Sequence, residues 1–335
     1  MYSGAARTAP KMLVLLSNAV KVESVPLNFN FFPGIPVRRV RQHCPESLYD
    51  GENKSRTGRH LDLNTITEVV RQPLDPPGAQ WRAGDAFLAG GTWLFSDQQP
   101  KLRRLIDLMP LGWDSLTVSD SGLEIGAMCT IRDLHALPAP ADWPAAALFT
   151  TSCEAFLASF KVWNTATVGG NICMSLPAGP MITMTVALEA TYTLLSPDGS
   201  ERVVDAADFV TGNNTNVLAT GEVLRRIDIP ASALRKRHAH RRFTLTHLGR
   251  STIFMIATQR RDADDLLLTI TAGTTRPVRL AFDVMPAADE LARSIDELPS
   301  ELWFDDPNGS PDHRHHLATY YAEQIRAELG SGGGS

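Results

Sequence analysis

The chain has 335 residues, of which 43% are hydrophobic and 21% are charged, and its net charge at pH 7 is −5. This length exceeds one average domain and is sufficient for a sizeable core, so two or three domains are expected. The slightly acidic balance gives no case for a protein that binds nucleic acid or a membrane surface.

The four cysteines, Cys44, Cys129, Cys153 and Cys173, are widely scattered. No Cys-x-x-Cys pair is present, so neither a zinc site nor an iron–sulfur cluster is indicated in this chain, and no metal site is expected. This pattern is typical of a reducing cytoplasm, which is the expected location. No apolar run approaches the ~20 residues that span a bilayer. The short apolar stretch 12–20 lacks a clear cleavage site, so a secretory signal is not expected.

The predicted elements begin after a polar extension of unknown role, residues 1–60. Residues 61–70 predict a short strand and then a helix capped by Asn64 or Thr65, because Glu68 lies at capping-box distance from Thr65. Strands are predicted next, and an alanine-rich helix follows them. The strands are at 87–89, 104–108, 116–118 and 123–125, and the helix is at 145–158.

The second half of the chain continues the alternation. An apolar helix is predicted at 181–190, and a hairpin is predicted from 191–195 through the turn at 197–199 to 202–204. Further strands are predicted at 243–260 and 266–272, and helices at 290–297 and 315–329. The final Gly-Ser run, 330–335, is expected to be an engineered linker outside the fold. The whole pattern predicts an α+β protein.

Two glycine-bearing segments are the strongest functional signal: Phe87-Leu-Ala-Gly-Gly-Thr-Trp-Leu94 and Thr165-Ala-Thr-Val-Gly-Gly-Asn-Ile172. Glycine lets the backbone approach a ligand closely, and successive amides form an anion site to which a threonine hydroxyl adds a donor. A single Gly-Gly is more often only a tight turn. A third glycine at Rossmann spacing does not follow Gly90-Gly91, so a nicotinamide site of that kind is not indicated.

Together these segments resemble the two FAD-diphosphate loops of the flavin subunit of molybdenum hydroxylases. Further matches lie in order along the chain, from about residue 61 to 285. They are Leu105–Leu108, Leu123–Ala127 with Thr130, Ser196–Ser200, Asp208–Gly212, Gly221–Leu224 and Ile227–Pro230.

The resemblance implies a two-subdomain FAD-binding fold of the vanillyl-alcohol-oxidase/molybdopterin dehydrogenase type over 61–230. It also implies a small C-terminal α+β domain over 231–329. FAD would be held without a covalent link. The residues that the resemblance assigns to it are Ala89, Gly90, Gly91, Thr92, Trp93, Thr167, Gly169, Gly170, Asn171 and Leu224.

Three departures from the family pattern affect polar contacts. An arginine expected before the second loop is Trp163 here, and an expected aspartate and threonine are replaced by Pro180 and Met174. Proline has neither a carboxylate nor an N–H, so one contact to the flavin nucleotide is absent or is supplied from elsewhere. Trp93 is expected either to stack near the flavin or to fill the core beneath its loop.

Other candidate residues have ordinary alternatives. Cys173 either lines the flavin loop or is a buried inert thiol. The basic run Arg235–Arg242 is expected to be a solvated loop, although docking of an acidic partner, of an electron acceptor or of FAD phosphates also fits. By the resemblance, His247 and Arg250 fall in a strand region that flanks the flavin ring, where they either tune the flavin or have a structural role. His313, His315 and His316 are expected to be surface residues rather than metal ligands.

The resemblance implies a FAD-binding electron-transfer subunit that works with a large molybdopterin subunit and a small [2Fe–2S] subunit as a dimer of heterotrimers. It would pass electrons from the iron–sulfur clusters to an external acceptor. One alternative is a degenerate member that serves as a scaffolding subunit with weak or no FAD binding. Another is a stand-alone flavin oxidase or reductase. No hydrolytic triad or paired carboxylate is apparent.

Overall fold

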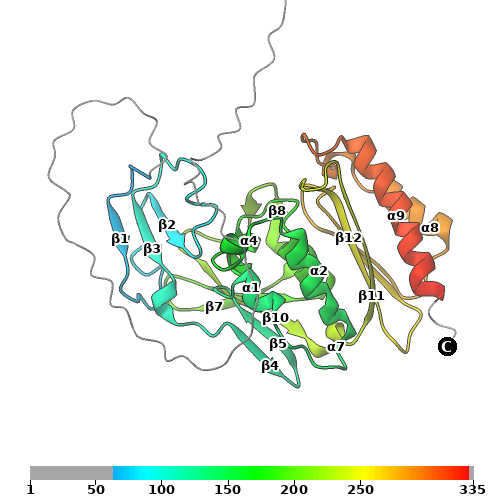
Figure 1. Cartoon of the computed structure of the whole chain (residues 1–335), viewed down its shortest axis with the longest axis horizontal. Coiled ribbons are helices and arrows are strands. Elements are labelled where there is room, and N and C mark those ends of the chain that lie inside the picture. The colour runs from blue at the N-terminus through cyan, green and yellow to red at the C-terminus, as the bar shows by residue number, and fades with distance from the viewer. Residues whose placement is uncertain (1–62, 332–335) are drawn as a thin grey trace, which may run out of the picture. The chain divides into compact units, whose positions relative to one another are not determined.

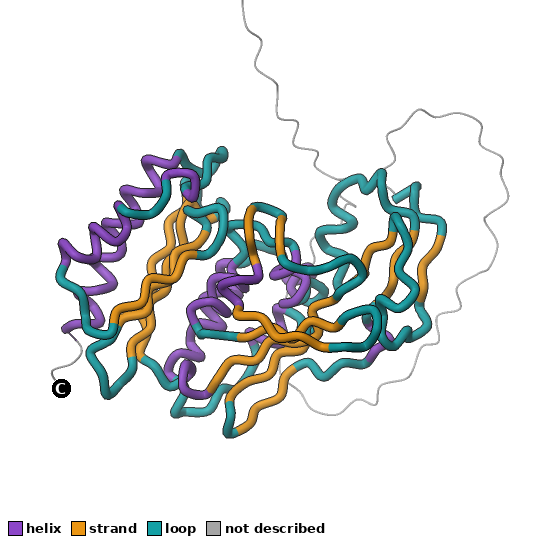
Figure 2. The backbone as a smooth tube through the Cα atoms, turned by 180° about the vertical axis from the view of Figure 1, so that it is seen from behind, coloured by secondary structure: helices purple, strands orange, loops and turns teal. Residues whose placement is uncertain are grey.

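The computed structural model describes residues 63–331. Over this range helices and strands are mixed along the chain, and the strands form four separate sheets, which confirms the α+β class (Figures 1 and 2). The predicted extension at 1–60 and the last four residues of the predicted linker lie outside the described residues.

The first sheet has three short parallel strands in the order β1, β3, β2. The strands are β1 (Glu68–Val70), β2 (Asp85–Leu88) and β3 (Arg104–Asp107). The helix predicted at 61–70 is therefore wrong over its described part. The Thr65 hydroxyl donates to the Gln99 carbonyl at 2.9 Å, and the Thr67 amide donates to the Arg103 carbonyl at 2.8 Å. Hydrogen bonds to this distant segment take the place of the hydrogen bonds within a helical turn.

A buried ion pair joins β2 to β3. Arg104 donates from Nε to Asp85 Oδ1 at 2.9 Å and from Nη2 to Oδ2, and the two side chains are 5% and 1% exposed. The Arg82 amide also donates to Asp85 Oδ2, at 2.7 Å. The hydrogen bonds from Arg104 hold the pKa of Asp85 below its usual value, against the opposing effect of burial. Because β2 ends at Leu88, this pair fixes the base of the first glycine-bearing segment.

The second sheet is antiparallel and contains five strands in the order β4-β5-β10-β6-β7. The hairpin predicted from 191 to 204 is confirmed as β6 and β7. A bulge between Leu224 and Arg226 breaks the register of β10 with β6. The strands are β4 (Leu116–Ser119), β5 (Gly122–Gly126), β6 (Thr191–Leu195), β7 (Glu201–Asp205) and β10 (Val223–Pro230).

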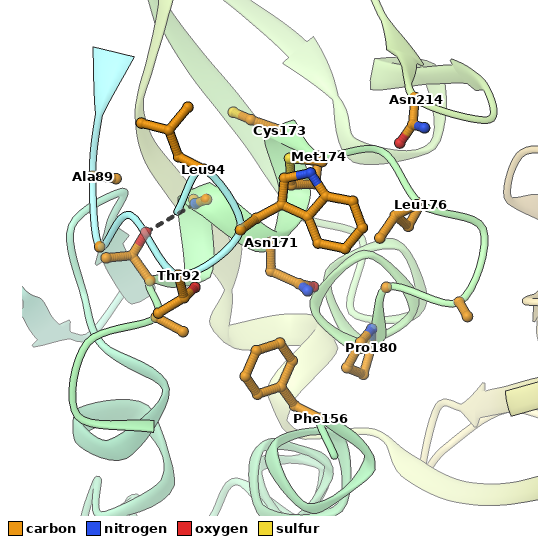
Figure 3. A pocket seen from close by; sticks show the side chains of 18 of the residues that line it. Ala89, Thr92, Leu94, Phe156, Asn171, Cys173, Met174, Leu176, Pro180 and Asn214 are labelled. Atoms are coloured by element: carbon orange, nitrogen blue, oxygen red, sulfur yellow. Dashed lines mark hydrogen bonds between the residues drawn. The ribbon is translucent and has the colours of Figure 1, made fainter. Parts of the chain in front are cut away.

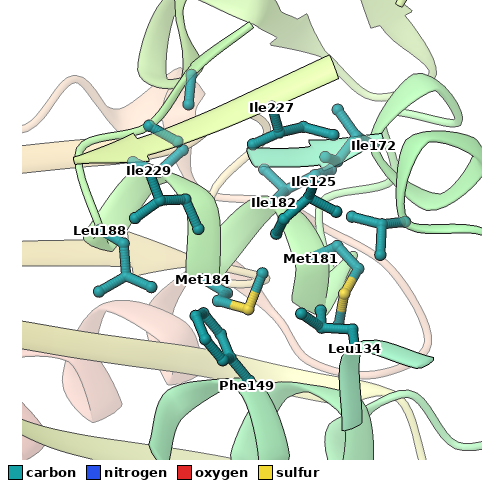
Figure 4. Packing of buried hydrophobic residues seen from close by; sticks show 14 of the residues in the cluster. Ile125, Leu134, Phe149, Ile172, Met181, Ile182, Met184, Leu188, Ile227 and Ile229 are labelled. Carbon is teal, nitrogen blue, oxygen red and sulfur yellow. The ribbon is translucent and has the colours of Figure 1, made fainter. Parts of the chain in front are cut away.

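Short helices pack on this sheet and enclose the main core. In Figure 4 Phe149 of α2 and Met184 of α5 point toward one another, and Ile227 pairs in register with Ile125. Both apolar helices predicted here are confirmed, with α2 three residues shorter at its end. The helices are η1 (Met109–Leu111), α1 (Ile131–His135), η2 (Pro144–Ala146), α2 (Ala147–Ala155), α3 (Phe160–Trp163), α4 (Val168–Cys173), α5 (Pro180–Ala187), α6 (Ala206–Phe209) and α7 (Ala231–Leu234). A two-stranded ribbon, β8 (Val210–Gly212) and β9 (Thr215–Asn216), follows α6.

The C-terminal part is a four-stranded antiparallel meander, β11-β12-β13-β14. Helices α8 and α9 cover one of its faces and have a second apolar cluster beneath them, while α5 packs against β12 and β13 (Figures 1 and 2). The elements are β11 (Arg237–Thr244), β12 (Ser251–Gln259), β13 (Leu266–Thr271), β14 (Val278–Phe282), α8 (Ala288–Asp296), η3 (Ser300–Leu302) and α9 (Pro311–Ser331).

The solvated basic loop predicted at 235–242 is wrong, because most of that run forms β11. Ala239 is buried in the C-terminal core, and Arg241 donates to Gln324 and Glu328 of α9. Arg242 donates to the Ser251 hydroxyl at 2.7 Å. Arginine has a long apolar stem that packs along a strand while its head group finds a partner, so a basic run can occupy a half-buried strand.

Two boundaries also differ from the prediction. The strand predicted at 243–260 is the end of β11, a turn, and β12, so His247 and Arg250 lie in the turn rather than in a strand. Helix α9 continues through Gly330 and Ser331, the first two residues of the predicted linker. Because the end of α9 packs on the core, the helix continues through residues of low helix propensity such as Gly330.

Asp85→Asn should destabilise the protein, because it leaves the buried Arg104 with only a long, 3.9 Å ionic contact to the half-exposed Glu68 among the described residues. The expected loss in the free energy of unfolding is about 3–5 kcal/mol, measured by urea titration at pH 7. Because the folded pKa of Asp85 is lowered, its contribution is present above the unfolded value of about 3.9 and is lost as pH falls through the folded value. The difference between wild type and variant should therefore shrink on acidification.

The matched control is Asp142→Asn, whose exposed pair with Arg235 should contribute little to stability because solvent screens it. Equal urea midpoints for wild type and Asp85→Asn at pH 7 would contradict a structural role for the buried pair.

Candidate functional site

The two glycine-bearing segments are in direct contact. A Cβ added to Gly90 would lie 1.8 Å from the Thr165 carbonyl oxygen, so only glycine fits where the segments touch. Gly91 has φ = +69°, a conformation that other residues rarely adopt. We call residues 89–94 the first loop and residues 165–171 the second loop.

The first loop has unused backbone donors. Within residues 63–331, no hydrogen bond uses the amides of Gly90, Gly91, Thr92 or Trp93, whereas the carbonyls of Gly91 and Trp93 accept from Phe95 and Ser96. Backbone amides without partners must be satisfied by water or by a ligand. Successive free amides around a left-handed residue are suited to an anion.

The second loop differs, because its glycine amides are already bonded. The Gly169 amide donates to the Ala127 carbonyl at 3.1 Å, and the Gly170 amide donates to the Thr167 hydroxyl oxygen at 3.0 Å. The expectation that both loops offer free glycine amides is therefore corrected for this loop. Thr167 caps α4, and its hydroxyl accepts one bond while its own O–H stays available.

The loops line one cavity of about 970 Å³. All the residues that the sequence assigns to FAD lie on its wall, from both loops and from β10. Figure 3 shows Thr92 and Asn171 around its central space, with Phe156 and Pro180 on other sides. A cavity of this size is at the upper end of the range for small-molecule and cofactor sites.

Some of the polar side chains on the wall already form hydrogen bonds within the protein. Asn171 accepts the Met181 amide on its Oδ1 at 3.2 Å, which leaves its two Nδ2 hydrogens for a ligand. Glu222 receives a bidentate pair from Arg202 at 2.7 Å, and this pairing lowers the pKa of Glu222. Both acidic residues of the wall are paired with arginines, Glu222 with Arg202 and Asp306 with Arg314, whereas Arg250 forms no salt bridge among the described residues and is available to an anionic ligand.

Cys173, Trp93 and Leu224 all lie on the cavity wall. Burial raises the pKa of the Cys173 thiol to about 12, so it is neutral and unreactive at pH 7. Trp93 is 40% exposed and does not fill the core, which leaves its indole at the rim of the cavity. Leu224 is buried at the bulge of β10.

Two of the three residues that depart from the family pattern, Pro180 and Trp163, have structural roles. Pro180 is the first residue of α5, where a missing N–H is tolerated and the fixed φ favours the helix. The indole of Trp163 donates to the Phe156 carbonyl at 3.2 Å and lies 5.0 Å from the His135 ring. Phe156 lines the cavity, so Trp163 supports the wall from outside.

Several wall residues carry no signal in the sequence. Phe156, Leu176 and Asn214 come from irregular segments, and Arg314 comes from the last helix. Arg250 also lines the cavity, but His247, predicted with it, does not. Only the fold brings these segments together.

The histidines of α9 are engaged in different contacts. His315 lies against Trp303 and is 3.0 Å from Asp296, while His313 packs on Phe243. Over residues 63–331 no group of three or more His, Cys, Asp or Glu side chains is arranged to hold a metal ion.

Residues 66–232 match the sequence profile of the FAD binding domain in molybdopterin dehydrogenase. The chain carries a FAD-binding domain of this family. Its predicted relationship to the flavin subunits of molybdenum hydroxylases is thereby confirmed, with FAD as the cofactor.

Individual relatives agree with this assignment. The domain is similar to the carbon monoxide dehydrogenase medium chain of Hydrogenophaga pseudoflava, with 32% identity over 114 residues, which are 34% of this chain and 38% of the relative. Xanthine dehydrogenase 2 of Arabidopsis thaliana is 27% identical over 123 residues, 35% of this chain but only 9% of that protein. The matches thus span well under half of each relative.

Solved structures show the same fold. A chain of the reconstituted CO dehydrogenase from Oligotropha carboxidovorans aligns with a TM-score of 0.67 at 18% identity, over 78% of this chain and 98% of that chain. A chain of quinoline 2-oxidoreductase from Pseudomonas putida 86 aligns with a TM-score of 0.64 at 21% identity, over 80% and 98%.

Gly90→Ala should disrupt the site, because its Cβ would collide with the Thr165 carbonyl and force the loops apart. The expected result is at least a tenfold rise in the Kd for FAD, about 1.4 kcal/mol or more, measured by quenching of FAD fluorescence. Gly212→Ala is the matched control, since its Cβ meets only ordinary contacts at 3.8 Å or more. If Gly90→Ala bound FAD as the wild type does, contact between the loops would not control the site.

Proposed function

We propose that this chain is the FAD-binding electron-transfer subunit of a molybdenum hydroxylase or dehydrogenase complex. It would pass electrons from the [2Fe–2S] clusters of a partner subunit to an external acceptor. The observation that carries the proposal is the row of unpaired amides at Gly90–Trp93 on the wall of a cofactor-sized cavity. When bound, FAD supplies the redox chemistry, and the protein supplies binding, orientation and electrostatics.

The first loop is proposed to hold the FAD diphosphate. Each hydrogen bond to a charged group contributes about 1.5–3 kcal/mol, so several amides acting together give tight binding. They are held in place before the cofactor arrives, because Gly90 rests on Thr165 and β2 is fixed by Asp85 and Arg104. Preorganisation of this kind lowers the entropic cost of binding.

The second loop is proposed to contribute side chains rather than glycine amides. The Thr167 hydroxyl retains its hydrogen, and the Asn171 Nδ2 group retains both of its hydrogens. The bonds to Gly170 and Met181 fix the orientation of these side chains. The roles of Gly169 and Gly170 are then steric, since a Cβ on Gly169 would lie 2.6 Å from the Ala127 carbonyl oxygen.

The partners proposed for this chain are a large molybdopterin-binding subunit and a small iron–sulfur subunit, assembled as a dimer of heterotrimers. The support is the similarity to the medium chain of carbon monoxide dehydrogenase. We place the complex in the cytoplasm, where the free thiols of Cys129, Cys153 and Cys173 would stay reduced. Within residues 63–331, no helix is long and apolar enough to cross a membrane.

The scaffolding alternative rests on the substitutions at Trp163 and Pro180. Each is accommodated by a defined structural role, and neither closes the cavity or occupies the free amides of the first loop. These observations favour retained FAD binding.

Wild-type protein should bind one FAD and show flavin absorbance after reconstitution, and Thr167→Val should weaken that binding by roughly tenfold through loss of a donor. Thr167→Ser keeps the hydroxyl and should bind nearly as the wild type does. The affinity of the wild type and of both variants for FAD is measured by titration calorimetry.

The control is Thr130→Val, which removes a comparable helix cap from α1 but lies off the cavity wall. It should lose about 1 kcal/mol of stability and keep its FAD affinity. A wild type that binds no FAD, alone or in its native complex, would refute the proposed function and favour a scaffolding subunit.

A further inference from the structure

One end of the cavity is formed by the C-terminal part of the chain. Ser251 and Ala272 line it at the ends of β12 and β13, with Phe304, Asp306 and Arg314. These residues lie beyond the segment that matches the FAD-binding family, which ends at residue 232.

Ala272 connects this end to the wall formed by the FAD-binding domain. Its amide donates to the Pro177 carbonyl at 2.8 Å, and its carbonyl accepts from Arg314 Nη1. Ala272 has φ = +63°, a left-handed conformation that residues with a Cβ rarely adopt. A residue keeps such a conformation only where its surroundings hold it, and here both of its backbone groups are bonded.

Arg314 is the group that holds Ala272. Its side chain is 1% exposed, and it donates to the carbonyls of Gly309 and Thr252 at 2.9 Å as well as to Ala272. Its Nη2 pairs with Asp306. Four of the five guanidinium hydrogens are thus used, in a geometry that lysine cannot reproduce.

The bond from Ala272 joins residues 176–180 of the wall to the C-terminal sheet, whereas the other backbone hydrogen bonds described for this stretch are local, such as that from the Gly179 amide to the Leu176 carbonyl at 2.9 Å. Pro177 lies in residues 176–180, which line the cavity and lead into α5. Helix α5 itself has a separate link to the C-terminal sheet, a 2.6 Å hydrogen bond between the Thr183 and Thr271 hydroxyls. Loss of Arg314 would therefore release Ala272 and Pro177 without undocking α5.

We propose that Arg314 is a positioning residue for FAD, acting through Ala272 on the 176–180 wall. The inference rests on the proposed function and extends it, since it makes the last helix of the chain a determinant of cofactor binding. Through this link, α9 fixes the width of the cavity at the end that is formed by the C-terminal part of the chain.

The test uses the full chain with Arg314→Met and Arg314→Lys. FAD affinity is measured by fluorescence quenching, and the visible circular dichroism of the bound flavin is recorded, both well below the melting temperature of each apoprotein. Arg314→Met should raise the Kd for FAD roughly tenfold and change the flavin dichroism. Arg314→Lys keeps the positive charge beside Asp306 but cannot make all of the hydrogen bonds of the guanidinium group. Its Kd for FAD should therefore lie between those of the wild type and Arg314→Met.

Arg326→Met is the matched control, because Arg326 lies on the same helix and, within residues 63–331, its side chain pairs with Glu323 alone. It should leave the Kd and the dichroism unchanged. Folded Arg314 variants with a lower melting temperature but wild-type Kd and dichroism would overturn the inference while leaving the proposed function intact. If Arg314→Met does not fold, Arg314→Lys gives the same decision. Absence of FAD binding by the wild type would refute both.

Discussion

The site depends on the close approach of two backbone segments, in which Gly90 lies against the Thr165 carbonyl. A side chain at residue 90 would need the space that the carbonyl occupies, so glycine is required by packing as well as by flexibility. The buried pair of Asp85 and Arg104 fixes the strand that leads into this contact. On the other side, Ile131 donates to the Ala166 carbonyl at 2.9 Å and holds the second loop. These contacts therefore hold the two loops that bound the cavity at a fixed separation.

The two loops are similar in sequence but have different roles in the structure. The first loop has free amides, while the glycine amides of the second are bonded to Ala127 and Thr167. An anion at this site would therefore meet main-chain donors on one side and oriented side chains on the other. The second loop leads into the short capped helix α4, and its Gly169 permits close packing against Ala127. The same Gly-Gly pair thus leaves its amides free in one loop and packs within the fold in the other.

The sequence predicted the parts of the structure that depend on local pattern. The apolar helices, the 191–204 hairpin and the α+β class follow from periodicity and turn residues. The helix expected at 61–70 was wrong because pairing with 99–104 outweighs a capping-box pattern. The basic run at 235–242 forms a strand because its side chains find partners on α9 and at Ser251, which no local rule reveals.

The composition of the site was partly predictable from the sequence. The residues of the two loops and Leu224 could be assigned by resemblance, and they do share one cavity. Which amides are free could not be predicted, since that depends on the contacts of Gly169 with Ala127. The contribution of Arg314 depends on contacts among β12, β13 and α9. Such contacts leave no short-range pattern in the sequence.

Amide hydrogen exchange with and without FAD tests the central claim most directly. FAD should slow exchange strongly in the peptide containing residues 89–94, because the amides of residues 90–93 are unpaired without a ligand. Exchange at residues 169–171 should change little, because their amides are bonded already. Slowing confined to the second loop, or none in the first, would contradict the account.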